Sequence, residues 1–328
     1  MILLIALISL IVVISLMPKW ISVCKRLGLL WEDMNKPKHP RNVASSGGLI
    51  VVMGFVLSIL LFIAIRTFVY NEENGITINI LALLSVILIF AIIGLIDDLL
   101  GWRNGGLSIK LRLFLAFVAS IPLVVINAGV HSMGLPFLGN VNFGLLYPLL
   151  IIPLGIAGAS TVYNFLAGFN GLEAGQGIII ISFLSFIAYS TGSVWLAITG
   201  LCMVAALIGF LLFNFYPAKV FPGDILTYAI GALIASMAIL GNFEKIAVFV
   251  FIPYIIEMVL KLRGGLKKHS FGKPVKNGLE MPYKKIYGLT HFSIWFLKKF
   301  KNHVTEQDVV YLIWGIQILF CLLAILIL

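Results

Sequence analysis

The chain has 328 residues, of which 61% are hydrophobic and only 11% are charged. A soluble domain is nearer a quarter charged and less than half apolar, so an ordinary soluble enzyme is excluded. One membrane-spanning helix needs roughly 20 apolar residues, and the chain holds enough for about ten. We therefore expect an all-α, polytopic membrane protein that forms one integral-membrane domain over residues 1–328.

The net charge of +10 would suggest a nucleic-acid partner in a soluble protein. In a membrane protein, lysines and arginines gather in the cytoplasmic loops, which explains the charge without such a partner. We expect no nucleic acid to bind. Three cysteines are too few, and spaced too far apart, for a disulfide framework or a metal cluster.

Ten apolar runs predict the transmembrane helices. They cover residues 1–18, 47–66, 79–96, 111–127, 145–163, 176–191, 193–213, 224–241, 245–263 and 308–328. Of the 23 lysines and arginines, 21 lie in or beside the loops 19–46, 97–110, 164–175, 214–223 and 264–307. Only Arg66 and Lys245 remain for the other side. The asymmetry predicts that these five loops are cytoplasmic and that both termini are external.

An acidic pair, Asp97-Asp98, follows directly on a long apolar run. Two carboxylates at the carboxyl end of a helix meet the negative end of its dipole and also repel each other. We therefore expect a cation or a metal ion beside them. The alternative is a solvated pair that only ends the helix.

The loop NFLAGFNGLEAGQG, residues 164–177, joins two predicted membrane helices. Its glycines allow a ligand to approach the backbone closely. The amides of Asn164 and Asn170 could offer oxygen to a hard cation or read the edge of a base. The alternative is a simple helix–turn–helix connection in which Asn and Gly serve as caps.

The segment 213–228 places Asp224 at the start of a predicted membrane helix. An acid there is favoured by the helix dipole, so a capping role is the plainer explanation from this segment alone. Phe221 precedes Pro222-Gly223 and could stack on a base or anchor the loop at the membrane surface.

The last predicted cytoplasmic loop, 264–307, is basic and includes Lys267-Lys268-His269. Such a loop suits nucleotide phosphates and anionic lipid head groups equally well, although topology alone predicts part of its charge. The acids and asparagines on the same side offer oxygen ligands. Together with phosphates, these ligands indicate Mg²⁺, or alternatively Mn²⁺, rather than zinc.

These motifs together resemble those of the polyprenyl-phosphate N-acetylhexosamine-1-phosphate transferases. That superfamily includes the bacterial phospho-MurNAc-pentapeptide transferases and the eukaryotic dolichyl-phosphate GlcNAc-1-phosphate transferases. The similarity runs from Asn35 to about Met281, and its markers are NKPKHPRNVASSGGL (35–49), the acidic pair, NFLAGFNGLEAGQG (164–177) and FNFYPAKVFPGD (213–224). The motif LAGxNGLEAGQ and the segment GLEMPY (278–283) are most similar to the archaeal and eukaryotic GlcNAc branch.

The resemblance implies an activity: transfer of GlcNAc-1-phosphate, or a related N-acetylhexosamine-1-phosphate, from a UDP-sugar to polyprenyl or dolichyl phosphate. UMP is released, and the step is the first membrane step of a glycan assembly pathway such as N-glycosylation. By position in the motifs, Asn164 and Asp224 are the expected Mg²⁺ ligands. Asn170 is expected to read uracil and Phe221 to stack on it, with Glu173 also among the substrate-binding residues.

The resemblance also assigns Asp97 and Asp98 to the lipid phosphate, and Lys110 to a phosphate contact, as the catalytic set. We expect Asp97 to deprotonate or orient the lipid phosphate and Asp98 to hold a nearby cation such as Lys110. The last loop has neither the histidine cluster of the peptidoglycan enzymes nor the Arg-rich motif of the eukaryotic ones. Lys268 and His269 are the expected substrate-binding residues there.

Several alternatives remain open at this point. Direct in-line attack is preferred, and a covalent aspartyl-phosphate route is the alternative. The donor could be another UDP-sugar or the peptidoglycan precursor. A second alternative is an ion-coupled transporter, which would need acids near the membrane midplane, where only Glu257 is a candidate. A third is a non-catalytic lipid-binding scaffold, which would not need the paired acids. We expect a multi-pass protein of the cell membrane, or of the endoplasmic reticulum if eukaryotic. Its expected partners besides the substrates are membrane lipid and, as an option, a second copy of the chain in a homodimer.

Overall fold

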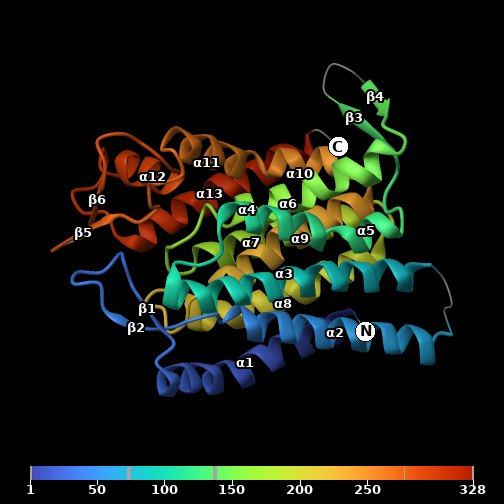
Figure 1. Cartoon of the computed structure of the whole chain (residues 1–328), viewed down its shortest axis with the longest axis horizontal. Helices are drawn as coiled ribbons and strands as arrows, with labels where there is room; N and C mark the ends of the chain where they lie inside the picture. Colours follow the sequence, from blue (N-terminus) through green and yellow to red (C-terminus); the bar gives the residue numbers. More distant parts are fainter. Residues whose placement is uncertain (1, 72–74, 136–138, 277, 327–328) are drawn as a thin grey trace.

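The computed structural model describes residues 2–71, 75–135, 139–276 and 278–326, and it is built mainly of helices that run side by side (Figure 1). Seven of the helices in these ranges are long and apolar enough to cross a membrane. They are α1 (Ile2–Leu27), α2 (Gly48–Phe68), α3 (Ile76–Asn104), α7 (Leu172–Ser190), α8 (Val194–Asn214), α9 (Gly223–Gly241) and α13 (Glu306–Ile325). The prediction of a polytopic helical membrane protein is confirmed in this form.

Two of the ten predicted spans are interrupted, and a third is one continuous helix that changes from π-helical to α-helical geometry. The run 111–127 divides into α4 (Ile109–Ala119) and α5 (Ile121–Val125), and the run 145–163 divides into the π-helix η1 (Tyr147–Ile151) and α6 (Ile152–Tyr163). The run 245–263 divides into α10 (Glu244–Val250) and α11 (Ile252–Arg263). A proline lies in the first turn of α5, η1, α6 and α11. Proline lacks the N–H that would continue the preceding helix, which explains the breaks before α5 and α11.

Three two-stranded antiparallel hairpins and one further short helix complete the described residues. The elements are β1 (Leu30–Glu32) with β2 (Arg41–Ala44), β3 (Ser132–Leu135) with β4 (Gly139–Asn142), β5 (Lys273–Val275) with β6 (Gly278–Glu280), and α12 (Leu289–Leu297). Figure 1 shows β1, β2, β5, β6 and α12 at one end of the helix bundle and the β3–β4 hairpin at the other. The loop 264–307 is therefore partly ordered into strands and a helix.

The α9 helix forms the centre of the bundle and packs against α3, α6, α2 and α7. It is buried along nearly its whole length. Gly94 of α3 lies directly against the backbone of Asp224 and Ile225, and Gly231 of α9 lies against the backbone of α6. No hydrophobic effect drives membrane helices together, so their association depends mainly on van der Waals packing. Small residues favour this packing because they let helix backbones approach closely. This close approach brings the carboxyl end of α3 to the amino end of α9.

A methyl group at Gly94 would clash with the backbone nitrogen of Ile225, an atom that cannot move without shifting α9. We expect Gly94→Ala to lower the free energy of unfolding by about 1–3 kcal/mol, the usual cost of overpacking. Gly315→Ala on α13 is the matched control, because nothing lies within 4 Å of the added methyl group. Thermal unfolding in detergent checks this, and equal unfolding temperatures for the two variants would contradict the packing described.

Candidate active site

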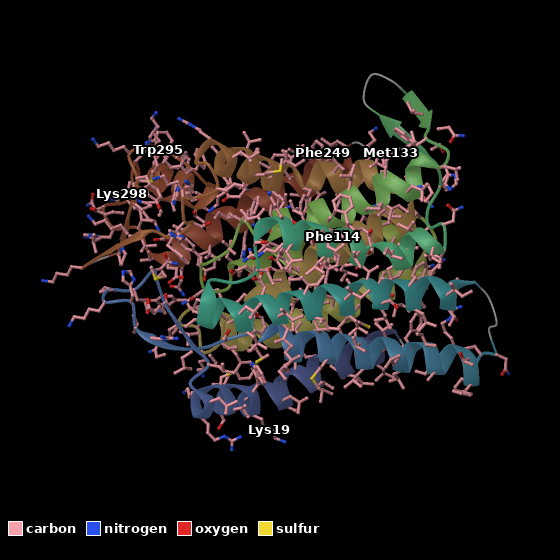
Figure 2. All side chains as sticks on the ribbon, viewed as in Figure 1. Lys19, Phe114, Met133, Phe249, Trp295 and Lys298 are labelled. Atoms are coloured by element: carbon pink, nitrogen blue, oxygen red, sulfur yellow. The ribbon has the colours of Figure 1, made fainter. Side chains whose placement is uncertain are left out.

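The five loops predicted to share one side of the membrane meet around a single cavity of about 500 Å³. We call it the aspartate cavity. Its wall includes Asp97, Asp98, Asn164 and Asp224, with further residues from each of these loops. Figure 2 shows Trp295 and Lys298, which belong to the predicted cytoplasmic loop 264–307, at the end of the bundle opposite Met133 of the β3–β4 hairpin.

The Asp98 carboxylate caps the amino terminus of another helix. Its Oδ1 accepts a hydrogen bond from the backbone N–H of Asp224 at 2.7 Å, and its Oδ2 accepts one from the Ser46 hydroxyl at 2.8 Å. The residue before α9 gives that helix no side-chain cap. Capping of the α9 amino terminus is thus done by a carboxylate of α3, and the Asp224 side chain contributes to the cavity wall.

The Asp97 carboxylate is buried and has a partner on each oxygen. Its Oδ1 accepts from the backbone N–H of Leu107 at 2.7 Å and from Nη2 of Arg112 at 3.0 Å. Its Oδ2 accepts from the Tyr228 hydroxyl at 3.1 Å and lies 2.6 Å from Nε of Arg112. The expected cation beside the acidic pair is therefore Arg112, and it pairs with Asp97 rather than with Asp98.

Lys110, the predicted cation, lies two residues before Arg112 in the first turn of α4 and is exposed. It is absent from the described lining of the aspartate cavity. Residues two apart on a helix point in different directions, so only one of the two basic side chains can face Asp97. Arg112, Tyr228 and Ser46 are site residues that the motif comparison missed. The only sequence signal for Arg112 was that it is a second basic residue within one helical turn of Lys110.

Asn164 ends α6 and meets α9 across the cavity wall. Its Oδ1 accepts a hydrogen bond from the Thr227 hydroxyl at 3.0 Å, and Thr227 lies one turn after Asp224. These contacts bring the two predicted metal ligands to one wall. No group of three His, Cys, Asp or Glu side chains within the described residues forms a ready-made metal site.

Phe221 is positioned by a backbone pairing between two distant segments. Its N–H donates to the carbonyl of Ala44 at 2.8 Å, and its own carbonyl accepts from the N–H of Gly47 at 2.9 Å. Gly47 lies so close to Val220 that no side chain fits there. The predicted aromatic thus lines the aspartate cavity, held from both sides along its backbone.

Asn170 is buried away from the described lining of the aspartate cavity. Its Nδ2 donates to Asp33 at 3.3 Å, and its backbone N–H donates to Glu306 at 2.7 Å. Glu173 does line the cavity, and its Oε1 accepts from the N–H of Gly168 at 2.7 Å. Of these two predicted substrate-binding residues, the structure brings only Glu173 to the cavity wall.

A second cavity of about 350 Å³ adjoins the first, and we call it the lysine cavity. Lys268 and His269 line it, as does Lys261 of α11. Its opposite wall is apolar and comes from α3 and α4, with the residues Phe90, Ile93, Ile109, Leu113 and Ala116. The two cavities share Arg112, Asn164, Ala167, Gly168 and Phe271. A guanidinium and an amide thus stand where the two cavities meet.

Comparison with known proteins agrees with this architecture. Residues 80–242 match the family described as glycosyl transferase family 4. The chain is 38% identical over 317 residues to a Sulfolobus acidocaldarius protein assigned as a UDP-N-acetylglucosamine–dolichyl-phosphate N-acetylglucosaminephosphotransferase, which covers 96% of this chain and 92% of the relative. A Saccharolobus solfataricus protein of the same assignment is 36% identical, with 93% and 90% covered.

A more distant relative is the phospho-N-acetylmuramoyl-pentapeptide-transferase of Halalkalibacterium halodurans, 30% identical with 97% of this chain and 94% of that protein covered. The chain belongs to glycosyl transferase family 4. The resemblance inferred from the sequence motifs is confirmed.

A glycine at the start of α9 leaves room for the Asp98 carboxylate. Gly223 has φ +73°, and a Cβ there would clash with Oδ2 of Asp98. Gly192 has φ +83° but nothing within 4 Å of an added Cβ, so it is a matched control for backbone strain. We expect both Ala variants to lose stability on the order of 1 kcal/mol from the left-handed backbone.

We expect only Gly223→Ala to lower the release of UMP from UDP-N-acetylglucosamine, by about 100-fold, because a displacement of about 1 Å in a site is enough for that loss. Thermal unfolding and UMP release measured on both variants check this. Equal turnover in the two variants would show that the contact between Asp98 and α9 does not shape the site.

Proposed function

We propose that the protein transfers GlcNAc-1-phosphate, or a related N-acetylhexosamine-1-phosphate, from a UDP-sugar to a polyprenyl or dolichyl phosphate and releases UMP. The observation that carries this proposal is the pair of adjoining cavities with a shared polar wall. One cavity is rich in carboxylates, and the other joins cationic residues to an apolar wall. A water-soluble donor and a membrane-bound acceptor need two such compartments that meet at one point. The names of the relatives at 38% and 36% identity support the same reaction.

We assign the nucleotide part of the donor, with its phosphates reaching towards the junction, to the aspartate cavity. The Phe221 ring offers a stacking surface for a base, and Asn164 with Asp224 offers oxygen ligands. The described lining includes one cation, Arg112, and a larger set of acids: Glu32, Asp33, Asp97, Asp98, Glu173 and Asp224. A doubly anionic pyrophosphate would be repelled by that lining unless a cation accompanied it.

The residues present fit a Mg²⁺ ion, with Mn²⁺ as the alternative. Mg²⁺ is commonly held by one or two protein oxygens together with substrate phosphates and water, so Asn164 and Asp224 suffice without a larger protein cluster. When bound, the ion would neutralise charge on the two donor phosphates. Both ligands lie on the wall of the aspartate cavity, where the donor would sit.

We assign the lipid chain of the acceptor to the apolar part of the lysine cavity, and the sugar phosphate of the donor to its basic part. Ile109 and Leu113 on its apolar wall are exposed on the outer side of the bundle, so a lipid chain can reach this wall from the membrane. The acceptor phosphate would then lie towards Arg112, at the junction with the donor cavity. Lys268 and His269 on the other wall are suited to the sugar phosphate.

The reaction proposed is a direct in-line displacement. An oxygen of the acceptor phosphate forms a bond to the β-phosphorus of the donor, the bond from that phosphorus to the bridging oxygen breaks, and UMP leaves with the electron pair. A phosphate monoester has a second pKa of about 6, so the attacking oxygen is already largely ionised at neutral pH. Arg112 at the junction can stabilise the negative charge, and Asp97 holds its guanidinium in place.

The proposed topology keeps ten membrane crossings. The broken pairs α4–α5 and α10–α11, together with the continuous helix η1–α6, would add three crossings to the seven long helices. Both termini would be external and the two cavities would open towards the cytoplasm. The strong bias of lysine and arginine towards the end that carries the site supports this orientation. The protein would then be a multi-pass protein of the cell membrane.

The reaction is tested with purified protein, UDP-GlcNAc, polyprenyl phosphate and Mg²⁺. We expect UMP and lipid-linked GlcNAc phosphate in equal amounts, loss of both with EDTA, and recovery with Mg²⁺. Asp224→Asn and Asn164→Ala should each lower turnover by more than the roughly 10–100-fold that outer-sphere contacts to a metal cost.

Glu280→Gln is the control for the loss of one carboxylate, since Glu280 pairs with Lys298 on the surface, away from the cavities. Its turnover should equal that of the wild type, and all three variants should keep the wild-type unfolding temperature. Near-normal turnover of Asp224→Asn across a Mg²⁺ titration would show that the ligand assignment is wrong.

The geometry of Asp97 also bears on its role. Both of its oxygens are occupied by Arg112, Tyr228 and Leu107, so we propose that it orients Arg112 and does not act as a base. Asp97→Asn should lower kcat by a constant factor between pH 6 and 9, because the loss of positioning does not depend on the ionisation of the lipid phosphate. A base would instead show a deficit that shrinks as the pH rises above the second phosphate pKa of about 6.

A further inference from the structure

A buried pair of opposite charges lies on one face of α11. Glu257 and Lys261 are four residues apart, so their side chains are neighbours on the helix, and they are 0% and 8% exposed. Nζ of Lys261 lies 3.9 Å from Oε1 of Glu257. Lysine and glutamate are rarely buried unless other groups satisfy them. The hydrogen bonds of this pair therefore indicate which segments of the chain it holds in place.

Lys261 holds the segment that lines the lysine cavity. Its ammonium donates to the carbonyl of Lys268 at 3.1 Å and to the Ser270 hydroxyl at 2.6 Å. The Ser270 hydroxyl in turn donates to the carbonyl of Phe165 at 3.2 Å, one residue after Asn164. One side chain thus joins α11 to the basic segment 268–270 and, through Ser270, to the segment that begins at Asn164.

Glu257 holds the other end of the same loop. Its Oε2 accepts from the backbone N–H of Leu289, the first residue of α12, at 2.5 Å. The Thr290 hydroxyl donates to the carbonyl of Ser270 at 2.7 Å, which closes the loop on itself. Both ends of the loop 264–288 are therefore fastened to one face of α11. These contacts also give Glu257, the deep acid considered for an ion path, a structural partner.

Two buried basic side chains, Lys261 and His291, lie against this loop, and Lys261 is the one that carries the positive charge. His291 lies close by, and burial together with the Lys261 ammonium lowers the pKa of its imidazole to about 4. The backbone N–H of Tyr287 donates to Nδ1 of His291 at 3.3 Å, which also requires an unprotonated Nδ1. His291 is neutral at physiological pH, whereas Lys261 lines the lysine cavity beside Lys268 and His269.

We propose that Lys261 is a positioning residue, which holds Lys268, His269 and Ser270 against the lysine cavity so that this segment can bind the sugar-phosphate part of the donor. The inference rests on the proposed function and deepens it. It accounts for a loop that lacks both the histidine cluster and the Arg-rich motif of related enzymes. The anchoring cation comes from the helix before the loop.

The test separates the sugar-phosphate part of the donor from its nucleotide part. Lys261→Met should raise KM for UDP-GlcNAc by about tenfold, the scale of one lost charge-assisted hydrogen bond. Inhibition by UMP should stay within about twofold, because UMP lacks the sugar and the β-phosphate and would not reach the segment. Lys261→Arg should recover most of the affinity for UDP-GlcNAc, since a guanidinium can also donate to the Lys268 carbonyl and to Ser270.

Two further variants keep the result interpretable. Lys285→Met removes the same charge from an exposed position in the same loop and should match the wild type. Glu257→Gln combined with Lys261→Met avoids an unpaired buried carboxylate and should show the same increase in KM with a wild-type unfolding temperature. If Lys261→Met behaves like Lys285→Met, or if UMP binding weakens in parallel with UDP-GlcNAc, the inference is overturned.

Equilibrium binding of UDP-GlcNAc and UMP, measured beside turnover, distinguishes this inference from the proposed function. Absence of lipid-linked product from the wild type would overturn the function. A Lys261→Met protein that binds UDP-GlcNAc as tightly as the wild type would overturn the role of Lys261.

Discussion

The site depends on one contact between two membrane helices: the Asp98 carboxylate accepts the backbone N–H of Asp224 at the amino end of α9. A helix amino terminus has unpaired N–H groups and a positive dipole end, so it binds a carboxylate well. The contact requires α3 and α9 to approach closely, which Gly94 and Gly223 allow. It places Asp97, Asp98 and Asp224 around one cavity, an arrangement that repulsion between carboxylates would otherwise oppose.

The remaining site residues follow from how that negative charge is balanced. Arg112 neutralises Asp97 and at the same time stands at the junction of the two cavities. On the far wall, the buried cation Lys261 holds the basic segment that closes the lysine cavity. Positive charge is thus built into the walls where phosphates would meet, and the acids face the region where a divalent cation would accompany the donor. In a cavity with low dielectric constant, such fixed charges act strongly.

Much of this arrangement could be predicted from local sequence patterns. Seven apolar runs form long helices, and the loops predicted to share one face do meet at one cavity. The two broken spans and the π-helical turn of a third were harder to predict. Their prolines are visible in the sequence, but a proline can kink a helix or end it, and packing decides between these outcomes.

The differences between the motif predictions and the geometry of the site have one physical origin, which is that hydrogen bonds between distant segments leave no local pattern. The contact of Ser46 with Asp98 spans 52 residues and that of Asp98 with Asp224 spans 126. The choice of Arg112 over Lys110 depends on which side of α4 faces Asp97. Asn170 matches a substrate-binding position by motif, yet its amide is tied to Asp33, far away in the chain.

The central claim is that the nucleotide part of the donor and the lipid chain of the acceptor occupy different cavities, which meet at Arg112 and Asn164. The most direct measurement is the KM for each substrate in two variants, Phe221→Ala in the aspartate cavity and Ala116→Phe, which fills the lysine cavity. The account predicts that Phe221→Ala raises KM for UDP-GlcNAc alone, by about tenfold, which is the scale of a lost stacking contact. Ala116→Phe should raise KM for polyprenyl phosphate more than KM for UDP-GlcNAc. An equal rise in both constants in either variant would contradict the account.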